Sequence, residues 1–323
     1  ILLIVVSIYK QWHSFSVGAV VATYFLFAGW MDAGSSFSMA ITFLSAYCLA
    51  FIIQSLLFKT SSSTILASSV LNLVLFYAIF YALLQDFHYL QWDGLLTWGM
   101  AVASFCLYLA SKYLNRGSLR FGYLALSLLF LTLAIPLELK DQWITIAWAV
   151  EASALTYIGI KLDVKLVKWA AYIAAFLAAQ QAFFTDLVEL EGYQRLLAIL
   201  VSAGLFYITG ISLAFNKLLK SNESFLPILN NFYATILSAG LIAVEFNRFE
   251  ISFYISVGWA VLALVITILG FVLKQRSLRL PGIFLFAFTI LKVFIYDTSE
   301  LTTLYRMTSF LVLGAILLLV SFG

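Results

Sequence analysis

The sequence is poor in charge: 10% of its 323 residues are Asp, Glu, Lys or Arg, against 64% that are hydrophobic. A soluble globular domain carries about a quarter of charged residues on average, so this composition excludes that class. The lipid bilayer is therefore the first partner that the sequence predicts. Proline is also scarce, with three residues in the whole chain, so the apolar segments run on with few interruptions.

Residues that carry metal and nucleophilic chemistry are few as well. The two cysteines, Cys48 and Cys106, fall in apolar runs without metal-ligand spacing, and the two histidines, His13 and His88, fall in separate connecting segments. The sequence contains no Walker loop and no HExxH, CxxC or GxSxG pattern. We therefore predict no catalytic residue, metal site or cofactor, and we favour a non-enzymatic protein. The net charge of +3 is spread in thin rows, which excludes a nucleic-acid partner.

Continuously apolar runs dominate the chain, and each is about as long as a membrane-crossing helix, which needs about 20 residues. We predict an all-α, polytopic transmembrane helix bundle. The apolar residues 1–9 are predicted to end a preceding span, and residues 10–323 to form a single transmembrane domain of helical hairpins with short loops. The twelve full spans are expected near residues 14–31, 36–57, 62–84, 94–111, 121–137, 142–160, 166–184, 194–215, 226–244, 251–273, 280–296 and 303–321.

Basic residues alternate between the connecting segments and thereby predict the orientation. Short loops rich in Lys and Arg stay in the cytoplasm. The C-terminus is accordingly predicted to be cytoplasmic. Thirteen of the eighteen basic residues lie in one alternate set of loops: Lys10, Lys59, Lys112, Arg116, Arg120, Lys161, Lys165, Lys168, Lys217, Lys220, Lys274, Arg276 and Arg279.

Acidic residues gather in the opposite set of loops, on the predicted outer side. Two interpretations remain open for them. Carboxylates such as Asp93 and Asp141 suit the N-terminal ends of helices, where they cap free backbone N–H groups. Alternatively, the acids form a face that attracts cations. The candidate residues of this outer acidic face are Asp86, Asp93, Glu138, Asp141, Asp186, Glu189 and Glu191.

Two ionisable residues are predicted within spans, where an uncompensated charge is costly and therefore marks a functional candidate. Glu151 lies about 13 Å from the outer end of its span at 1.5 Å per residue, and Lys292 lies closer to the surface. Three interpretations stay open. Glu151 is bonded inside the bundle while Lys292 extends toward Asp297; or the two form a buried ion pair; or Glu151 binds a proton or cation on a transport path.

The last outer hairpin and a short repeat complete the pattern. Asp297 and Arg306 are predicted to form a salt bridge across that hairpin. Ser118-Leu119-Arg120 and Ser277-Leu278-Arg279 each open a span that runs outward to an acidic connector, which is compatible with duplication of a two-helix unit or with ordinary hairpins.

Two segments resemble a known family. The stretch Leu131-Thr-Leu-Ala-Ile-Pro136 through Trp143 to Ala147-Trp-Ala-Val-Glu151-Ala, and the stretch Leu291-Lys292-Val-Phe-Ile-Tyr-Asp297 with Arg306-Met-Thr-Ser309-Phe310, are similar to motifs of a bacterial family of multi-spanning membrane proteins, domain of unknown function 2339. The resemblance implies a polytopic inner-membrane protein with further N-terminal segments and no established activity. It also marks Glu151, Lys292, Asp297 and Arg306 as positions that match the family pattern.

Three functions are compatible with these features. The leading hypothesis is a non-enzymatic scaffold or subunit of a cell-envelope assembly, with other membrane or envelope proteins as candidate partners. The second is a transporter or lipid-handling protein with a pathway near Glu151. The third is an intramembrane enzyme that acts on a lipid-linked substrate at the outer face.

Overall fold

The computed structural model describes residues 13–31, 36–58, 63–89, 92–215, 219, 223–248 and 254–297. Every regular element in these ranges is helical. The chain divides into two compact units: unit 1 comprises residues 1–140 with 164–170, and unit 2 comprises residues 141–163 with 171–323. The single domain over residues 10–323 and the end of a span at residues 1–9 stay predictions.

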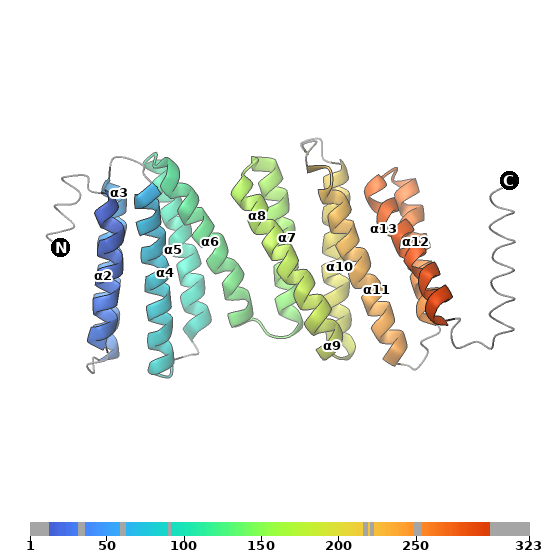
Figure 1. Cartoon of the computed structure of the whole chain (residues 1–323), viewed down its shortest axis with the longest axis horizontal. Coiled ribbons are helices and arrows are strands. Elements are labelled where there is room, and N and C mark those ends of the chain that lie inside the picture. Colours follow the sequence, from blue (N-terminus) through green and yellow to red (C-terminus); the bar gives the residue numbers. More distant parts are fainter. Residues whose placement is uncertain are drawn as a thin grey trace, which may run out of the picture. The chain divides into compact units, whose positions relative to one another are not determined.

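Unit 1 is built from long apolar helices that pack mostly against their neighbours in the sequence. Helix α5 packs along α6, and α4 contacts both α2 and α3 (Figure 1). The bounds are α2 His13–Met31, α3 Phe37–Leu57, α4 Ser63–Asp86, α5 Asp93–Tyr113 and α6 Gly117–Glu138. Polar side chains join the first three helices: Tyr24 donates to Asn72 Oδ1 at 2.8 Å, and Asn72 Nδ2 donates to the Cys48 carbonyl at 3.2 Å. Interhelical hydrogen bonds of this kind contribute about 1 kcal/mol each in membranes.

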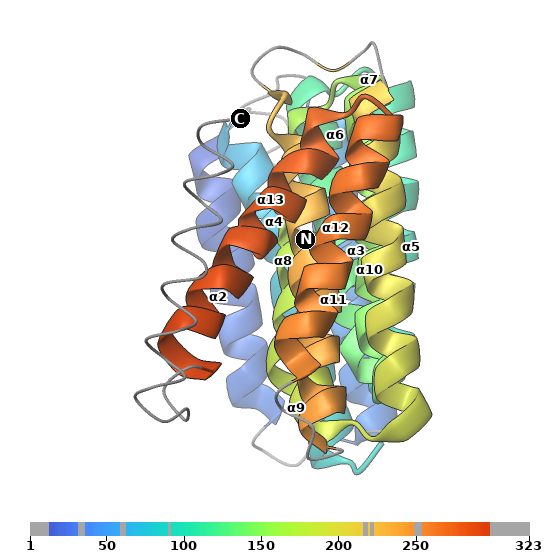
Figure 2. The same cartoon turned by 90° about the vertical axis from the view of Figure 1, so that its right-hand side faces the viewer.

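Unit 2 contains the remaining helices, again packed chiefly as consecutive pairs. Helix α10 packs along α11 and α12 along α13, while α7 lies against α10; Figure 2 places α12 and α13 nearest the viewer. The bounds are α7 Gln142–Leu162, α8 Lys165–Gln180, the π-helical η2 Gln181–Asp186, α9 Leu187–Glu189, α10 Gly192–Phe215, α11 Leu226–Arg248, α12 Tyr254–Val272, α13 Arg276–Lys292 and the π-helical η4 Val293–Asp297. Helix α8 begins in unit 1 and continues into unit 2.

Ten of the twelve predicted spans are confirmed as helices long and apolar enough to cross a membrane. The span predicted at 14–31 is helical too, with a shorter apolar stretch, Phe15–Met31. The span predicted at 303–321 lies outside the described residues. The largest difference concerns the span predicted at 166–184, which continues through η2 and α9 to Glu189. The connector predicted after Phe184 is therefore helical, and Asp186 belongs to a span.

The same turn closes two of the hairpins. After α5, Asn115 has a positive φ of 56°, Asn115 N–H bonds to the Lys112 carbonyl, and Arg116 N–H bonds to the Ser111 carbonyl at 2.8 Å. After α12, Lys274 (φ 54°) and Gln275 repeat these bonds to Phe271 and Gly270. This is the Schellman arrangement, which satisfies the free carbonyls at a helix end.

The turn after α7 is similar to the turns after α5 and α12, and so are the first residues of the helices that follow these turns. Asp163, after α7, also has a positive φ, of 51°, and its N–H bonds to the Gly159 and Ile160 carbonyls. A basic residue stands five positions after the positive-φ residue in each case: Arg120, Lys168 and Arg279. The repeat Ser-Leu-Arg in the sequence thus marks equivalent places on α6 and α13.

Close approach at Gly270 joins α12 to α13. A Cβ atom at this position would lie 2.8 Å from the backbone nitrogen of Arg279, which is too short for any real contact. A Cβ at Gly204 on α10 would meet no atom within 4 Å. We predict that Gly270→Ala destabilises the protein by about 1–3 kcal/mol through overpacking. Gly204→Ala, the matched control, leaves the midpoint of thermal unfolding in detergent equal or higher, since Ala is the better helix former.

Membrane orientation gives a second prediction. Tyr113 ends α5 beside Lys112 and is 89% exposed, and Tyr193 opens α10 after Glu191 and is 72% exposed. With Cys48 and Cys106 replaced by alanine, Tyr113→Cys should react with a membrane-impermeant maleimide only after the cells are opened, whereas Tyr193→Cys reacts on intact spheroplasts. Labelling of both from the same side would contradict the predicted topology.

Candidate functional site

Polar side chains converge at one end of unit 2, where α7 and α10 begin and where α9 and α11 end. Helix α7 contacts η2 and α10, and η2 also contacts α10 and α11. We call the residues that these elements contribute the polar cluster. Within it, Gln142, Thr145, Asp186 and Arg195 are at most 8% exposed. The full cluster consists of Gln142 and Thr145 on α7, Gln181 and Asp186 on η2, Arg195 on α10 and Glu245 on α11.

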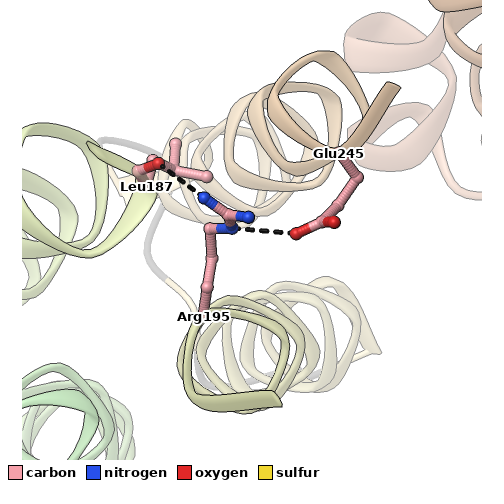
Figure 3. Close-up of polar contacts among 3 residues, drawn as sticks. All are labelled: Leu187, Arg195 and Glu245. Carbon is pink, nitrogen blue, oxygen red and sulfur yellow. Dashed lines mark hydrogen bonds and ion pairs between the residues drawn. The ribbon is translucent and has the colours of Figure 1, made fainter. Parts of the chain in front are cut away.

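A buried ion pair joins the first turn of α10 to the last turn of α11. Arg195 Nε donates to Glu245 Oε1 at 2.8 Å, and the two side chains are 6% and 19% exposed. Arg195 Nη1 also donates to the Leu187 carbonyl at 3.5 Å (Figure 3). The Glu245 carboxylate compensates the charge of the guanidinium, and the guanidinium also donates to the carbonyl of Leu187, the first residue of α9. Arg195 therefore links three elements of unit 2.

Asp186 is the most deeply buried acid of the polar cluster. It is the last residue of η2 and is 0% exposed. Thr145 and Gln181 lie near its carboxylate, as do the acids Asp141 and Glu189. Neither carboxylate oxygen makes a hydrogen bond of standard geometry within the described part of the chain, and the Thr145 hydroxyl makes none either. The burial of a carboxylate in this state requires a positive partner or a proton.

An apolar groove of about 560 Å³ lies beside the polar cluster in unit 2. The side chains of Ile236, Phe284 and Phe288 on its wall are about half exposed, so the groove opens toward the surroundings of the helices. Leu187 and Val188 follow Asp186 directly, and Val244 precedes Glu245, which places one end of the groove next to the polar cluster. The wall consists of Phe183, Leu187 and Val188, of α11 residues from Phe232 to Val244, of Trp259, and of Pro281, Phe284, Leu285 and Phe288 on α13.

Lys292, one of the predicted intramembrane charges, lies at this groove. Its Nζ donates to Ser256 Oγ at 2.8 Å and stands 5.8 Å from the centre of the Trp259 ring. Trp259 lines the groove and donates through Nε1 to the Ala239 carbonyl at 2.8 Å. The ammonium group is thus held over the groove wall by a hydroxyl and an aromatic face.

Glu151 is buried on α7, 8% exposed, as the sequence predicted for a side chain within a span. Its pairing with Lys292 and its role as a cation or proton site stay predictions. The predicted contact of Lys292 with Asp297 and the predicted Asp297–Arg306 salt bridge fall outside the described side chains.

The predicted outer acidic face separates into acids of different character. In unit 1, Asp93 and Glu138 come together: Asp93 Oδ1 accepts from Gly94 N–H at 2.7 Å, and the Glu138 side chain lies against Gly94. Asp86 is exposed. In unit 2, Asp141, Glu189 and Glu191 are exposed, unlike Asp186. Asp141 precedes α7 as expected but its carboxylate makes no capping hydrogen bond, because the residue has a positive φ of 51°.

The sequence alone does not pair Arg195 with Glu245, which are fifty positions apart. A usable signal was present: Arg195 is three residues after the start of α10, and Glu245 is three residues before the end of α11. Antiparallel neighbours place such residues at the same depth. The burial of Asp186 had no comparable signal, since the apolar run stops at Phe184.

The ion pair can be tested with a double-mutant cycle. Arg195→Met or Glu245→Gln alone leaves one buried charge without its partner, so we predict that each lowers the free energy of unfolding by about 3–5 kcal/mol. The double variant should be less destabilised than the sum of the two. Arg248→Met, at the exposed end of the same helix α11, is the control and should change stability by less than about 1 kcal/mol. Strict additivity of the two single changes would argue against the pair.

The chain was compared with known proteins. A family model described as predicted membrane protein (DUF2339) matches residues 1–249 and 233–323. No curated protein and no solved structure matches the chain. Since the two matched segments together cover the whole sequence, the chain belongs to this family of membrane proteins, whose function is not known.

Proposed function

We propose that the chain is a lipid-handling membrane protein and that the groove of unit 2 binds one acyl chain of a membrane lipid. The observation that carries this proposal is the groove itself, with its volume of about 560 Å³ and its apolar wall. Ligand sites in proteins commonly have volumes of several hundred Å³ and are lined by apolar and aromatic side chains with few polar groups. The open side gives a lipid access from the bilayer without passage through water.

The length of the groove suits an acyl chain. Its lining residues on α11 run from Phe232 to Val244, which corresponds to about 18 Å at 1.5 Å per residue. This is somewhat more than half of a hydrocarbon core about 30 Å thick, and it matches the depth of a single leaflet. The groove therefore extends along the membrane normal, as the chain of a lipid does.

Charge at one end of the groove favours a lipid with a phosphate group. Lys292 follows Phe288 by one turn of α13, and its ammonium group lies over Trp259. Its ammonium group donates to Ser256 Oγ at 2.8 Å. Trp and Lys at a membrane boundary are typical neighbours of lipid headgroups. The arrangement supports an acyl chain in the groove with its phosphate near Lys292.

Orientation follows from the segregation of the basic residues. The loops rich in Lys and Arg are proposed to face the cytoplasm of a bacterium. The end of the groove near Lys292 would then lie in the outer leaflet of the inner membrane. The groove would then serve a lipid of that leaflet.

A scaffold or subunit role in a cell-envelope assembly is the second candidate. The Arg195–Glu245 ion pair and the Schellman turn at Lys274 hold helices of unit 2 together. A scaffold requires such stable helix pairs. A transport path through Glu151 gains less support, because Glu151 is buried among the helices. The enzyme hypothesis, in which several outer acids converge on a lipid-linked substrate, stays a prediction.

Lipid binding can be tested by filling the groove. The full chain is placed in nanodiscs of phosphatidylethanolamine and phosphatidylglycerol that contain a phosphatidylglycerol with a photoreactive acyl chain. We expect crosslinks on α11 between Phe232 and Val244. Ala243→Phe should reduce them about tenfold, the effect of about 1.4 kcal/mol of lost binding. Ala154→Phe, the same change at an exposed position of α7, should leave them unchanged.

The charged end has its own control. Lys292→Gln should lower crosslinking of the phosphatidylglycerol probe but not of a photoreactive diacylglycerol, which has no phosphate. Lys274→Gln, in the exposed turn that precedes α13 at its opposite end, should affect neither probe. Equal crosslinking of Ala243→Phe and the unchanged chain would overturn the proposal.

A further inference from the structure

The buried carboxylate of Asp186 is not explained by the proposed lipid groove. Its side chain is 0% exposed, it lies in the span Lys165–Glu189, and neither of its oxygens accepts a hydrogen bond of standard geometry from the described residues. An ionised carboxylate in such a place is costly, since it has lost water and the side chains nearest to it, Thr145 and Gln181, are neutral. Buried carboxylates that persist in membrane proteins mark ion pathways and proton relays.

The charged groups around Asp186 do not supply the missing positive charge. The acids Asp141, before α7, and Glu189, on α9, are the nearby charges that act on it, and both repel a carboxylate. On α10, the Arg195 guanidinium faces Glu245 of α11 and the Leu187 carbonyl. The one cation of the polar cluster is thus already engaged by another acid.

The neighbours of Asp186 are oxygen-bearing groups suited to a small cation. The Thr145 hydroxyl is 0% exposed, and both it and the Gln181 side chain lie near the carboxylate. Gln142 is one turn from Thr145 on the same face of α7, and its Oε1 is buried without a hydrogen-bond partner in the described chain. Carboxylate, hydroxyl and amide oxygens are ligands for Na⁺ as well as acceptors for a protonated carboxyl group.

The backbone at this point is also unusual. Asp186 ends the π-helical segment η2, and π-helical turns within α-helices occur frequently at functional sites. The segment lies within one turn of the end of its span, so an ion has only a short distance to cross from the membrane surface. The side chain is therefore buried but close to water.

We infer that Asp186 is a binding site for one exchangeable positive charge, either H⁺ or Na⁺, formed with Thr145 and Gln181. In the proton form, the carboxylate takes up H⁺ to give a neutral carboxyl group that donates to the Thr145 hydroxyl. In the sodium form, the carboxylate stays ionised and the hydroxyl and amide oxygens complete the ligand set. Release of the ion regenerates the carboxylate. This site is separate from the lipid groove, although η2 contributes to both.

The test follows the carboxyl group directly. Infrared difference spectra of the full chain in nanodiscs are recorded as the pH is raised, once in sodium chloride and once in choline chloride. We expect a band of a protonated carboxyl group that disappears with rising pH and is absent from Asp186→Asn. If Na⁺ binds, the band disappears at lower pH in sodium chloride than in choline chloride; if only H⁺ binds, the two titrations coincide.

Two controls keep the outcome decisive. Glu189→Gln, an exposed acid three residues away, should retain the whole band. Thr145→Val should keep the band and displace its midpoint; this variant also serves if Asp186→Asn does not fold. A carboxyl band of Asp186 that ignores both pH and Na⁺, or the absence of any band that depends on Asp186 or Thr145, would overturn the inference. Neither result would change the lipid crosslinking expected on α11, so the two proposals can be refuted independently of each other.

Discussion

The structure depends on one constraint: in a hydrocarbon solvent, every polar group must find its partner within the protein. The backbone satisfies this constraint by forming helices throughout the described ranges. In the turns, backbone N–H groups donate to the free carbonyls at the end of the preceding helix. Polar side chains obey it too, as the Tyr24–Asn72 and Arg195–Glu245 contacts show. Against this background the Asp186 carboxylate stands apart, because it is fully buried and neither of its oxygens makes a hydrogen bond of standard geometry within the described ranges.

The elements that the sequence predicts well are those whose signal is local. Ten spans follow from uninterrupted apolar runs, and their ends agree with the helices to within a few residues in most cases. The span predicted at 166–184 is five residues shorter at its end than the helical segment, which continues to Glu189. Thr185, Asp186 and Glu189 are polar, so hydropathy ends the helix there, whereas tertiary packing against α7, α10 and α11 carries it on to Glu189. Hydropathy gives the average polarity of the residues in a segment, and it contains no information about the surroundings of one side chain.

The candidate site is predicted less well because its signals are non-local. Glu151 and Lys292 stand out in the sequence, since they are charges inside apolar runs, and both are buried or half-buried on their helices. Arg195 and Glu245 are fifty positions apart, and only the pairing of α10 with α11 brings their charges together. The groove is still less visible: its wall is made of ordinary apolar residues from five helical segments, and such residues are common everywhere in this chain. Its existence depends on how the helices are spaced, which composition does not encode.

The recurring Schellman turns have a consequence for biogenesis. Each turn at Asn115 and Lys274 is stabilised by hydrogen bonds within six residues, and the strongest packing joins the two helices that it connects. Such a pair has low contact order and can close before any distant segment has been synthesised. The nascent chain can therefore leave the translocon two helices at a time, each pair with the carbonyls of its turn already hydrogen-bonded.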